Sequence, residues 1–382
     1  MIISVGIMVI IAILAIMDQS RNNNELGIGA ITFFLGFLEI IFFFNATKNL
    51  NFGYSDLIVY YGYYQTMLGW NWTDFLSLHP FEFGYDLIVF IIAKIQYALG
   101  WQFTAHNFVL ILTILMVAIV YFAAKIQTNR SSAVFIALLY LWYQYSNVFS
   151  YNIVRQGLAL AFLSLSISLY QKYRRILPAF VVLVIATTFH SSILFLGAIP
   201  FFIIVFKHLK YTQASKESLS NTSINNNVLI SQKMWFFLLV GTLAYVTRLN
   251  SFLGKLPISL LQTYQSDSVA ALAAGIGIET NSLHFLLIAL GYMGIVSFIW
   301  YYNRTKIDDL YPFYLLFFSD TVIYLFMGFV PFSFRIEFAA LYILPLIFGI
   351  IIYRTGNKVF YMVLLLVVIT LGYYTGPFYL LK

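Results

Sequence analysis

The sequence predicts an all-α protein built as a polytopic transmembrane helical bundle, and its composition and hydropathy carry that prediction. Hydrophobic residues make up 62% of the 382 residues and charged residues only 9%, whereas about 25% of a soluble domain is charged. The mean hydropathy is +0.87. The apolar residues gather in runs that can cross a hydrocarbon core of about 30 Å as helices. A soluble globular domain is therefore excluded.

We expect about twelve spans and one interfacial helix, all within a single integral membrane domain that comprises residues 1–382. The interfacial helix is 84–99, because Asp86, Lys94 and Gln96 interrupt its apolar run. The first run lacks a basic n-region and a small-residue cleavage site, so it is expected to be a retained span. The expected spans are 2–17, 28–47, 105–124, 132–150, 157–170, 176–191, 193–206, 234–249, 283–302, 311–330, 337–353 and 359–376.

The positions of lysine and arginine predict the orientation of the chain. With the N-terminus outside and 84–99 not crossing, 14 of the 21 basic residues lie inside, as the positive-inside rule prefers. Residues 48–104 and 250–282 are then extracytoplasmic loops, and the Ser- and Asn-rich segment 207–233 is a flexible cytoplasmic loop. The inside residues are Arg21, Lys125, Arg130, Lys172, Arg174, Arg175, Lys207, Lys210, Lys216, Lys233, Arg304, Lys306, Arg354 and Lys358.

The formal net charge of +7 does not indicate a nucleic-acid partner, because the basic residues are spread singly and form no dense stripe. There is no Walker A sequence, no G-x-G-x-x-G after a strand, no H-E-x-x-H and no cysteine. An ATP-driven or zinc-dependent mechanism therefore has no support, and we expect no cofactor. Acid, base and arginine chemistry at a membrane face remains.

Three arginines on the outer side are candidates for that chemistry. Arg155, Arg248 and Arg335 lie at the outer ends of different spans. A guanidinium in hydrocarbon costs roughly 2.5 to 3.5 kcal/mol on insertion scales, so Arg155 needs a bundle interior, a wet cavity or an anionic partner. Arg155 also begins a predicted helical hairpin that returns to His190. The three arginines could converge on one anion in an extracytoplasmic cavity.

Five stretches follow one another in an order typical of one known family. They are FGYSDLIVYY, FEFGYDLI, YNIVRQGLALAF, ATTFHSSILF and FRIEFAALYILP. Together they resemble the EpsG family of exopolysaccharide polymerases, which are Wzy-type membrane enzymes, over about residues 50–345. The family's motif positions fall on Asp56, Tyr60, Glu82, Gly84, Asn152, Arg155, Gln156, Phe189, His190, Ser192, Arg335, Tyr342 and Pro345.

The resemblance implies polymerisation of undecaprenyl-diphosphate-linked oligosaccharide repeat units into exopolysaccharide or capsular polysaccharide at the outer face of the cytoplasmic membrane. Its partners would be the lipid-linked donor and acceptor, with a chain-length regulator and a flippase of the same pathway as further candidates. We also expect a GT-C-like architecture. Energy would come from the activated diphosphate bond, so no nucleotide motif is needed.

The resemblance also implies roles for individual residues. Arg155 and Arg335, together with Arg248 as the third outer arginine, would bind the diphosphate in place of a metal, because arginine binds such oxygens bidentately without losing its proton. The proton of the attacking hydroxyl would pass to a side chain that titrates near neutrality, or to a carboxylate. The candidate bases are His190, Asp56 and Glu82, and the supporting residues are Asn152, Gln156, Tyr60 and Tyr342.

Each of these residues also has a simpler interpretation, and other function classes stay open. Arg155 could snorkel or cap a helix, and Arg335 could pair with Glu337. Asp56 and Glu82 could be solvated loop acids. A transporter or flippase of lipid-linked oligosaccharides would show repeated halves, and none is visible. A membrane acyltransferase could use a histidine but leaves the outer arginines unexplained, whereas a ligase differs from a polymerase mainly in its acceptor.

The predicted orientation can be tested directly because the chain contains no cysteine. Single cysteines introduced in 48–104 and 250–282 should react with an impermeant thiol reagent in intact cells. A cysteine at position 220 should react only after the membrane is permeabilised, because this loop is expected inside. Labelling of position 220 in intact cells would overturn the orientation.

Overall fold

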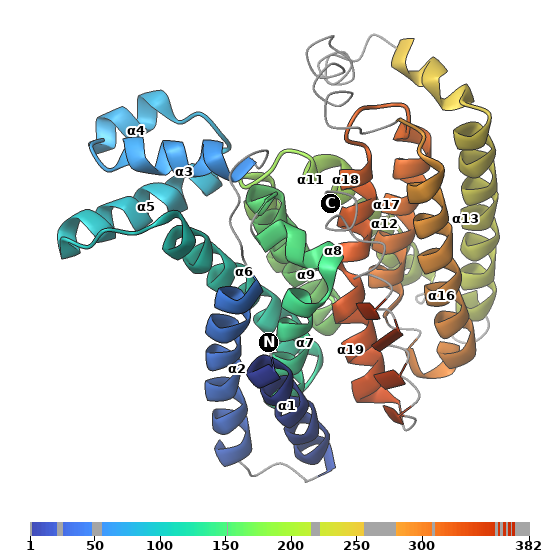
Figure 1. The fold of residues 1–382 in the computed structure, drawn as a ribbon. Helices are drawn as coiled ribbons and strands as arrows, with labels where there is room; N and C mark the ends of the chain where they lie inside the picture. Colours follow the sequence, from blue (N-terminus) through green and yellow to red (C-terminus); the bar gives the residue numbers. More distant parts are fainter. Residues whose placement is uncertain are drawn as a thin grey trace. The chain divides into compact units, whose positions relative to one another are not determined.

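The computed structural model describes most of the chain, and every regular element in that part is a helix (Figure 1). The described residues are 2–20, 26–47, 56–150, 152–214, 222–255, 280–307, 310–355, 358–359, 362–363, 366–367 and 369–370. The all-α prediction is therefore confirmed over these ranges. The chain divides into two compact units, 1–197 with 342–382 and 198–341.

Unit 1 contains the first two helices, a group of three short ones, and a packed core. Its elements are α1 (Ile2–Ser20), α2 (Leu26–Thr47), α3 (Asp56–Met67), α4 (Trp72–Leu78), α5 (Phe83–Leu99), α6 (Ala105–Gln127), α7 (Arg130–Trp142), α8 (Gln144–Asn147), η2 (Val148–Ser150), α9 (Val154–Tyr173), α10 (Ile176–Thr187), α11 (Ile193–Leu196) and α19 (Leu344–Arg354). Within unit 1, α9 packs most extensively against α6 and α10.

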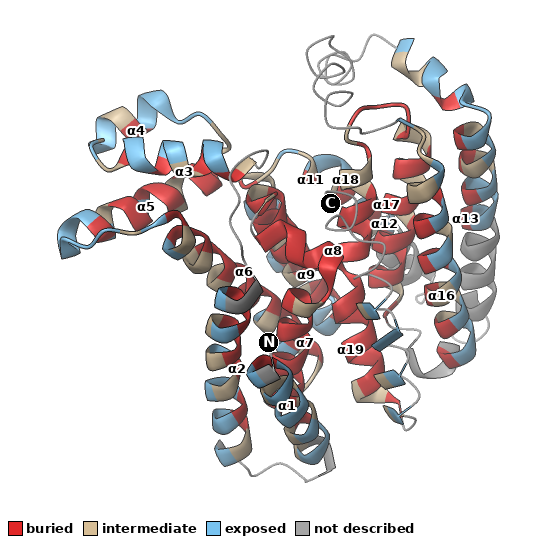
Figure 2. Ribbon diagram, in the orientation of Figure 1, coloured by how far each residue is buried: buried red, intermediate tan, exposed pale blue. Residues whose placement is uncertain are grey.

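Helix α9 is buried on almost every face (Figure 2). Its small residues permit this, as they do in other membrane helix packings. A Cβ atom at Gly157 would lie 2.6 Å from the carbonyl oxygen of Phe149. The buried hydroxyl of Ser166 donates to the carbonyl oxygen of Ala179 on α10 at 2.6 Å, so it is not left unpaired inside the bundle. The position of α9 is therefore set by close backbone approach.

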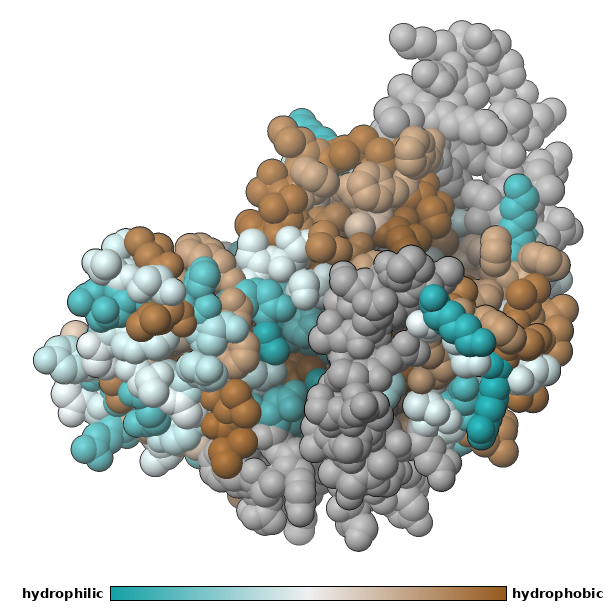
Figure 3. Space-filling model, turned by 90° about the horizontal axis from the view of Figure 1, so that it is seen from above, coloured by the Kyte–Doolittle hydropathy of each residue, from teal (hydrophilic) through white to brown (hydrophobic). Residues whose placement is uncertain are grey.

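Helices α3, α4 and α5 form a group of their own between α2 and α6 along the chain (Figure 1). Phe75 of α4 is fully buried and stacks on Phe90 of α5, with ring centroids 4.9 Å apart. Asn71 and Asp74 form a reciprocal capping box that starts α4. Seen from above, the surface over this group is mostly hydrophilic or intermediate (Figure 3). The helix expected at 84–99 is confirmed as α5, although its interfacial position stays a prediction.

Unit 2 is a helical bundle whose elements are α12 (Ala198–Ala214), α13 (Thr222–Val246), η3 (Leu249–Lys255), α16 (Leu283–Ile307), α17 (Tyr311–Met327) and α18 (Phe334–Tyr342). Helices α13 and α17 pack closely, and a Cβ at Gly241 would lie 3.2 Å from Cβ of Leu325. The hydroxyls of Tyr245 and Tyr324 are 2.6 Å apart, which joins the same two helices by a hydrogen bond.

The structure does not confirm the count of twelve spans. By length and apolar composition, four described helices can cross a membrane: 27–45, 105–127, 283–303 and 334–354. The number rises to six if each of two bent helix pairs counts as one span. Several of the other expected spans correspond to shorter apolar helices, such as α7 and α10. Where these runs are described they form helices, but the helices begin and end at other residues than the runs, some being longer and some shorter. Most of 359–376 lies outside the described residues.

The three expected loops have more helix than predicted where they are described. Helices α12 and α13 extend into 207–233 from both sides, and 215–221 lie outside the described residues. Of 250–282, residues 256–279 lie outside them too. The sidedness of these segments and the GT-C-like architecture stay predictions.

Candidate active site around Arg155

Arg155 lies in the first turn of α9, directly after a break in the helical path. The pair of helical segments 144–150 and 154–173 is bent by 116°. Ile153 precedes α9 and provides no side-chain cap for its free N–H groups. The positive end of the α9 dipole and the guanidinium therefore lie together, an arrangement that favours an anion.

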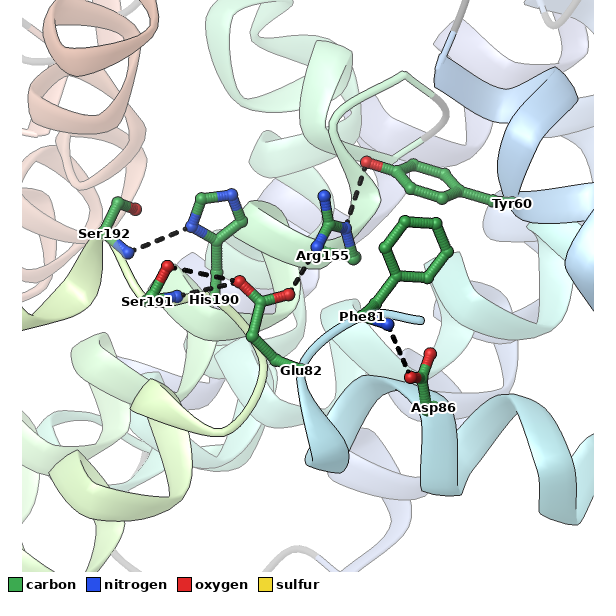
Figure 4. A network of polar contacts seen from close by, with 8 residues as sticks. All are labelled: Tyr60, Phe81, Glu82, Asp86, Arg155, His190, Ser191 and Ser192. Carbon is green, nitrogen blue, oxygen red and sulfur yellow. Dashed lines mark hydrogen bonds and ion pairs between the residues drawn. The ribbon is translucent and has the colours of Figure 1, made fainter. Parts of the chain in front are cut away.

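Aromatic side chains from α3 and from the α4–α5 turn hold the guanidinium (Figure 4). Its Cζ lies 4.3 Å from the ring centroid of Phe81 and 5.4 Å from that of Tyr60. Nε of Arg155 donates to the Tyr60 hydroxyl at 3.3 Å, and Tyr60 is only 3% exposed. These contacts stabilise the cation by cation–π attraction and restrict its orientation.

Glu82 neutralises this arginine. Nη1 of Arg155 pairs with Oε2 of Glu82, and both side chains are 20% exposed. The other oxygen, Oε1, accepts from the Ser191 N–H at 3.1 Å and from its hydroxyl at 3.3 Å (Figure 4). Residues 82, 155 and 191, distant in sequence, therefore form one network, and Glu82 is not a solvated loop acid.

The surroundings of Glu82 favour its charged form. Burial alone would raise the pKa of this carboxyl, but the Arg155 charge, the Ser191 N–H and His190 together hold the pKa below its usual value. A lowered folded-state pKa adds stability above the unfolded value of about 4.3, and this stability is lost as pH falls through the folded value. Glu82 is therefore ionised at neutral pH.

Gly84 fixes the start of α5 against the end of α10. Its N–H donates to the carbonyl oxygen of Thr188 at 2.7 Å. A Cβ at this position would collide with the Thr188 hydroxyl and would lie 2.9 Å from that carbonyl oxygen. Only glycine permits this approach without displacement, and the approach holds Glu82 beside Ser191.

The ring of His190 is oriented by the chain that follows it. The Ser192 N–H points to Nδ1 of His190 at 3.2 Å (Figure 4). Because a backbone N–H can only donate, Nδ1 accepts, and the neutral ring must carry its proton on Nε2. His190 is therefore oriented to donate from Nε2.

The remaining unit 1 candidates have structural contacts of their own. Asn152 lies in the turn before α9, and its side-chain oxygen accepts from the backbone N–H of Asp56 at 3.2 Å. Helix α9 starts after Asn152. The side chain of Asn152 therefore joins the chain just before α9 to the beginning of α3. Gln156 is 3% exposed. Tyr342 is 1% exposed and packs edge-on to Tyr140, with centroids 4.8 Å apart.

Two candidate arginines belong to unit 2. Arg248 is exposed and has a left-handed φ of 59° just after α13. Arg335 lies in the first turn of α18, with its Cζ 5.2 Å from the ring centroid of Phe332. Convergence of all three arginines stays a prediction. Within the described ranges, no group of three or more His, Asp or Glu side chains is placed to hold a metal.

Sequence reasoning missed two members of the network, Phe81 and Ser191. Phe81 acts through its ring and Ser191 partly through its backbone N–H, and neither contact has a residue pattern that reveals it. Both residues lie inside the quoted stretches FEFGYDLI and ATTFHSSILF, but not at the motif positions themselves. Their position beside motif residues within these stretches was the one available signal.

Comparison with known proteins identifies the family of the chain. The family model of EpsG matches residues 30–378, a range that includes every motif position named above. The chain belongs to the EpsG family. Membership indicates a membrane protein with an exopolysaccharide polymerase role, and hence a glycosyltransferase-like activity. No curated protein and no solved structure matches the chain.

The Gly84 contact predicts a sensitive position in this EpsG-family protein. Gly84→Ala should displace Thr188 and move Glu82 away from Ser191, with an overpacking cost of about 1–3 kcal/mol. We expect a lower thermal unfolding midpoint in detergent and a loss of chain elongation. Gly62→Ala on α3 is the matched control, because a Cβ there meets nothing within 4 Å. Equal behaviour of the two variants would contradict the Gly84–Thr188 constraint.

Proposed function

We propose that this protein joins oligosaccharide repeat units carried on undecaprenyl diphosphate into an exopolysaccharide or capsular polysaccharide, at the outer face of the cytoplasmic membrane. Family membership supports the polymerase role. One observation supports the assignment of the site: Arg155 is held by aromatic rings and paired with a single carboxylate that an incoming anion can replace.

The part of the Arg155 guanidinium that pairs with Glu82 can also bind a phosphate. Carboxylates and phosphates bind a guanidinium through the same bidentate geometry. A diphosphate carries more negative charge than Glu82, so the donor would displace the carboxylate from Arg155. The rings of Phe81 and Tyr60 would keep the guanidinium in place during this exchange.

Displacement of Glu82 from Arg155 would also make Glu82 a better base. Once Arg155 binds the diphosphate, Glu82 loses its nearest positive charge, and its pKa rises toward a value useful for accepting a proton. Glu82 would stay beside the site because Ser191 still holds Oε1. Donor binding and activation of the base are then one event. This coupling favours Glu82 as the base over the other two candidates, His190 and Asp56.

The proposed step is a single displacement. The acceptor hydroxyl oxygen bonds to the anomeric carbon of the donor sugar as the bond from that carbon to the diphosphate oxygen breaks. The hydroxyl proton passes to Glu82, and the lipid diphosphate leaves with the bonding electrons. Arg155 stabilises the charge that grows on the leaving group.

His190 has a donor role in this proposal. Its Nε2 proton is available in the neutral ring because Nδ1 accepts from Ser192, so it would donate to a phosphate or sugar oxygen. Arg248 and Arg335 are proposed as further diphosphate ligands. Tyr60 supports the site through Arg155, and Gln156 and Tyr342 stay proposed support residues. A chain-length regulator and a flippase are the proposed protein partners.

The activity and the role of Arg155 can be tested on the purified full-length chain with lipid-linked repeat units. The wild type should form chains of several units. Arg155→Lys keeps the charge but loses the planar fork, so kcat should fall about 100-fold or more, with a smaller change in KM. Arg174→Lys, which replaces an exposed arginine at the other end of α9, is the control.

Near-normal elongation by Arg155→Lys at matched protein level would remove Arg155 from the mechanism. Movement of lipid-linked units across vesicle membranes without elongation would instead identify a flippase. In cells, loss of a polymerase should leave single repeat units on the outer side, whereas loss of a flippase should trap them inside.

We also propose that turnover needs no divalent metal, because arginine charge neutralises the diphosphate. Elongation should persist in an excess of chelator, with rates compared before and after chelator is added. Loss of activity that Mg²⁺ or Mn²⁺ restores would overturn the arginine-only mechanism and give Asp56 and Glu82 a role as metal ligands.

A further inference from the structure

Asp86 is a buried carboxylate next to the site, and the mechanism above does not use it. It lies in the first turn of α5 and is 0% exposed. Its Oδ2 accepts from the Phe81 N–H at 2.8 Å (Figure 4). Its Oδ1 is buried and has no hydrogen-bond partner among the residues the structure describes. A buried carboxylate is costly, so this position needs an explanation.

The hydrogen bond from the Phe81 N–H to Asp86 closes the turn formed by residues 81–86, which contains Phe81 and Glu82. The Asp86 N–H donates to the carbonyl oxygen of Glu82 at 3.1 Å, which closes the same turn a second time. The ring of Phe81 lies under the Arg155 guanidinium and 5.5 Å from the Tyr60 ring. Glu82 is the next residue in the chain. The backbone at Phe81 therefore determines where both the aromatic contact and the paired carboxylate meet Arg155.

We propose that Asp86 is a positioning residue whose carboxylate holds the 81–86 turn, and through it Phe81 and Glu82, in the geometry that Arg155 requires. Its effect on turnover rests on the proposed function, but its effect on the turn does not. An ionised acceptor makes a shorter and stronger hydrogen bond than a neutral one, so the carboxylate fixes the Phe81 N–H better than the protonated acid does.

The same arrangement makes the turn sensitive to pH. The charged and titratable groups that face Asp86 are His79 and Glu82 from the turn, Arg155 from α9 and Tyr85 from α5. Burial raises the pKa of Asp86 to about 6, against the opposing effects of the Phe81 N–H, His79 and Arg155. Above that pH the carboxylate holds the turn, and below it the neutral acid accepts more weakly.

Hydrogen exchange tests the positioning role without any assay of activity. Purified full-length wild type, Asp86→Asn and Asp86→Ala are compared at pH 7.5 in detergent, on peptides that cover 79–86 and 188–192. Asp86→Ala should raise exchange in both, because Glu82 connects the turn to the Ser191 N–H. Asp86→Asn keeps an acceptor oxygen and should resemble the wild type. Asp74→Asn removes another carboxylate of the 48–104 segment and should leave hydrogen exchange in 188–192 unchanged.

Chain elongation over pH 5 to 8 tests the consequence for turnover. Asp86→Ala should lower kcat about 10-fold or more at every pH, because small misplacements of a reacting group are costly. The wild type should lose activity below about pH 6. Asp86→Asn should stay within about 3-fold of the wild type at pH 7.5 and should lack this decline.

The outcomes separate the alternatives. Unchanged exchange in a folded Asp86→Ala protein overturns the positioning role. If Asp86→Asn is as inactive as Asp86→Ala while its turn stays protected, Asp86 acts through its proton and the proposal is wrong. If the wild type elongates no chain, the polymerase proposal fails, and exchange alone still decides whether Asp86 holds the turn. If Asp86→Ala does not fold, the comparison of Asp86→Asn with the wild type across pH decides.

Discussion

The charge of one arginine at the start of a buried helix determines how the surrounding chain is arranged. Removing one partner of a buried ion pair costs about 3–5 kcal/mol, because the other charge stays unpaired; the pair here is 20% exposed, so its cost lies toward the lower end. Glu82 must therefore reach Arg155. The α3–α5 group, the contact of Gly84 with Thr188 and the Ser191 N–H all place it there. In the proposed mechanism the same pair also serves substrate binding, because the diphosphate takes the place of the Glu82 carboxylate on Arg155.

Sequence reasoning could select candidate residues for this site, but it could not show how they are connected. Arg155 was recognisable because a guanidinium near hydrocarbon requires a partner, and motif order indicated Glu82 and His190. The pairing of Glu82 with Arg155 was not predictable, because 72 residues and several helices separate them in the chain. The tautomer of His190 depends on a backbone N–H two residues later. Asn152 was expected only as a supporting residue of the site, but the chain bends there and its side chain accepts from the backbone N–H at the start of α3.

The same contrast applies to the fold. Composition predicts membrane helices reliably because every backbone polar group in hydrocarbon must be paired within a helix. Apolar runs do not reveal where a helix ends inside them. The expected span 132–150 is α7 followed by α8 and η2, and 157–170 is part of a longer α9 that begins at a bend. A turn that is buried in protein need not interrupt an apolar run, so hydropathy alone does not show where one helix ends and the next begins.

The close packing of α9 has a consequence for the depth of the site. Lipid-facing helices adapt to bilayer thickness by tilting or shifting along their axes. Helix α9 has almost no lipid-facing surface, and the contacts of Gly157 with Phe149 and of Ser166 with Ala179 resist sliding. The position of Arg155 along the axis of α9 is therefore fixed by packing inside unit 1. A thicker or thinner membrane would adjust around the neighbouring helices and would not move Arg155 relative to them.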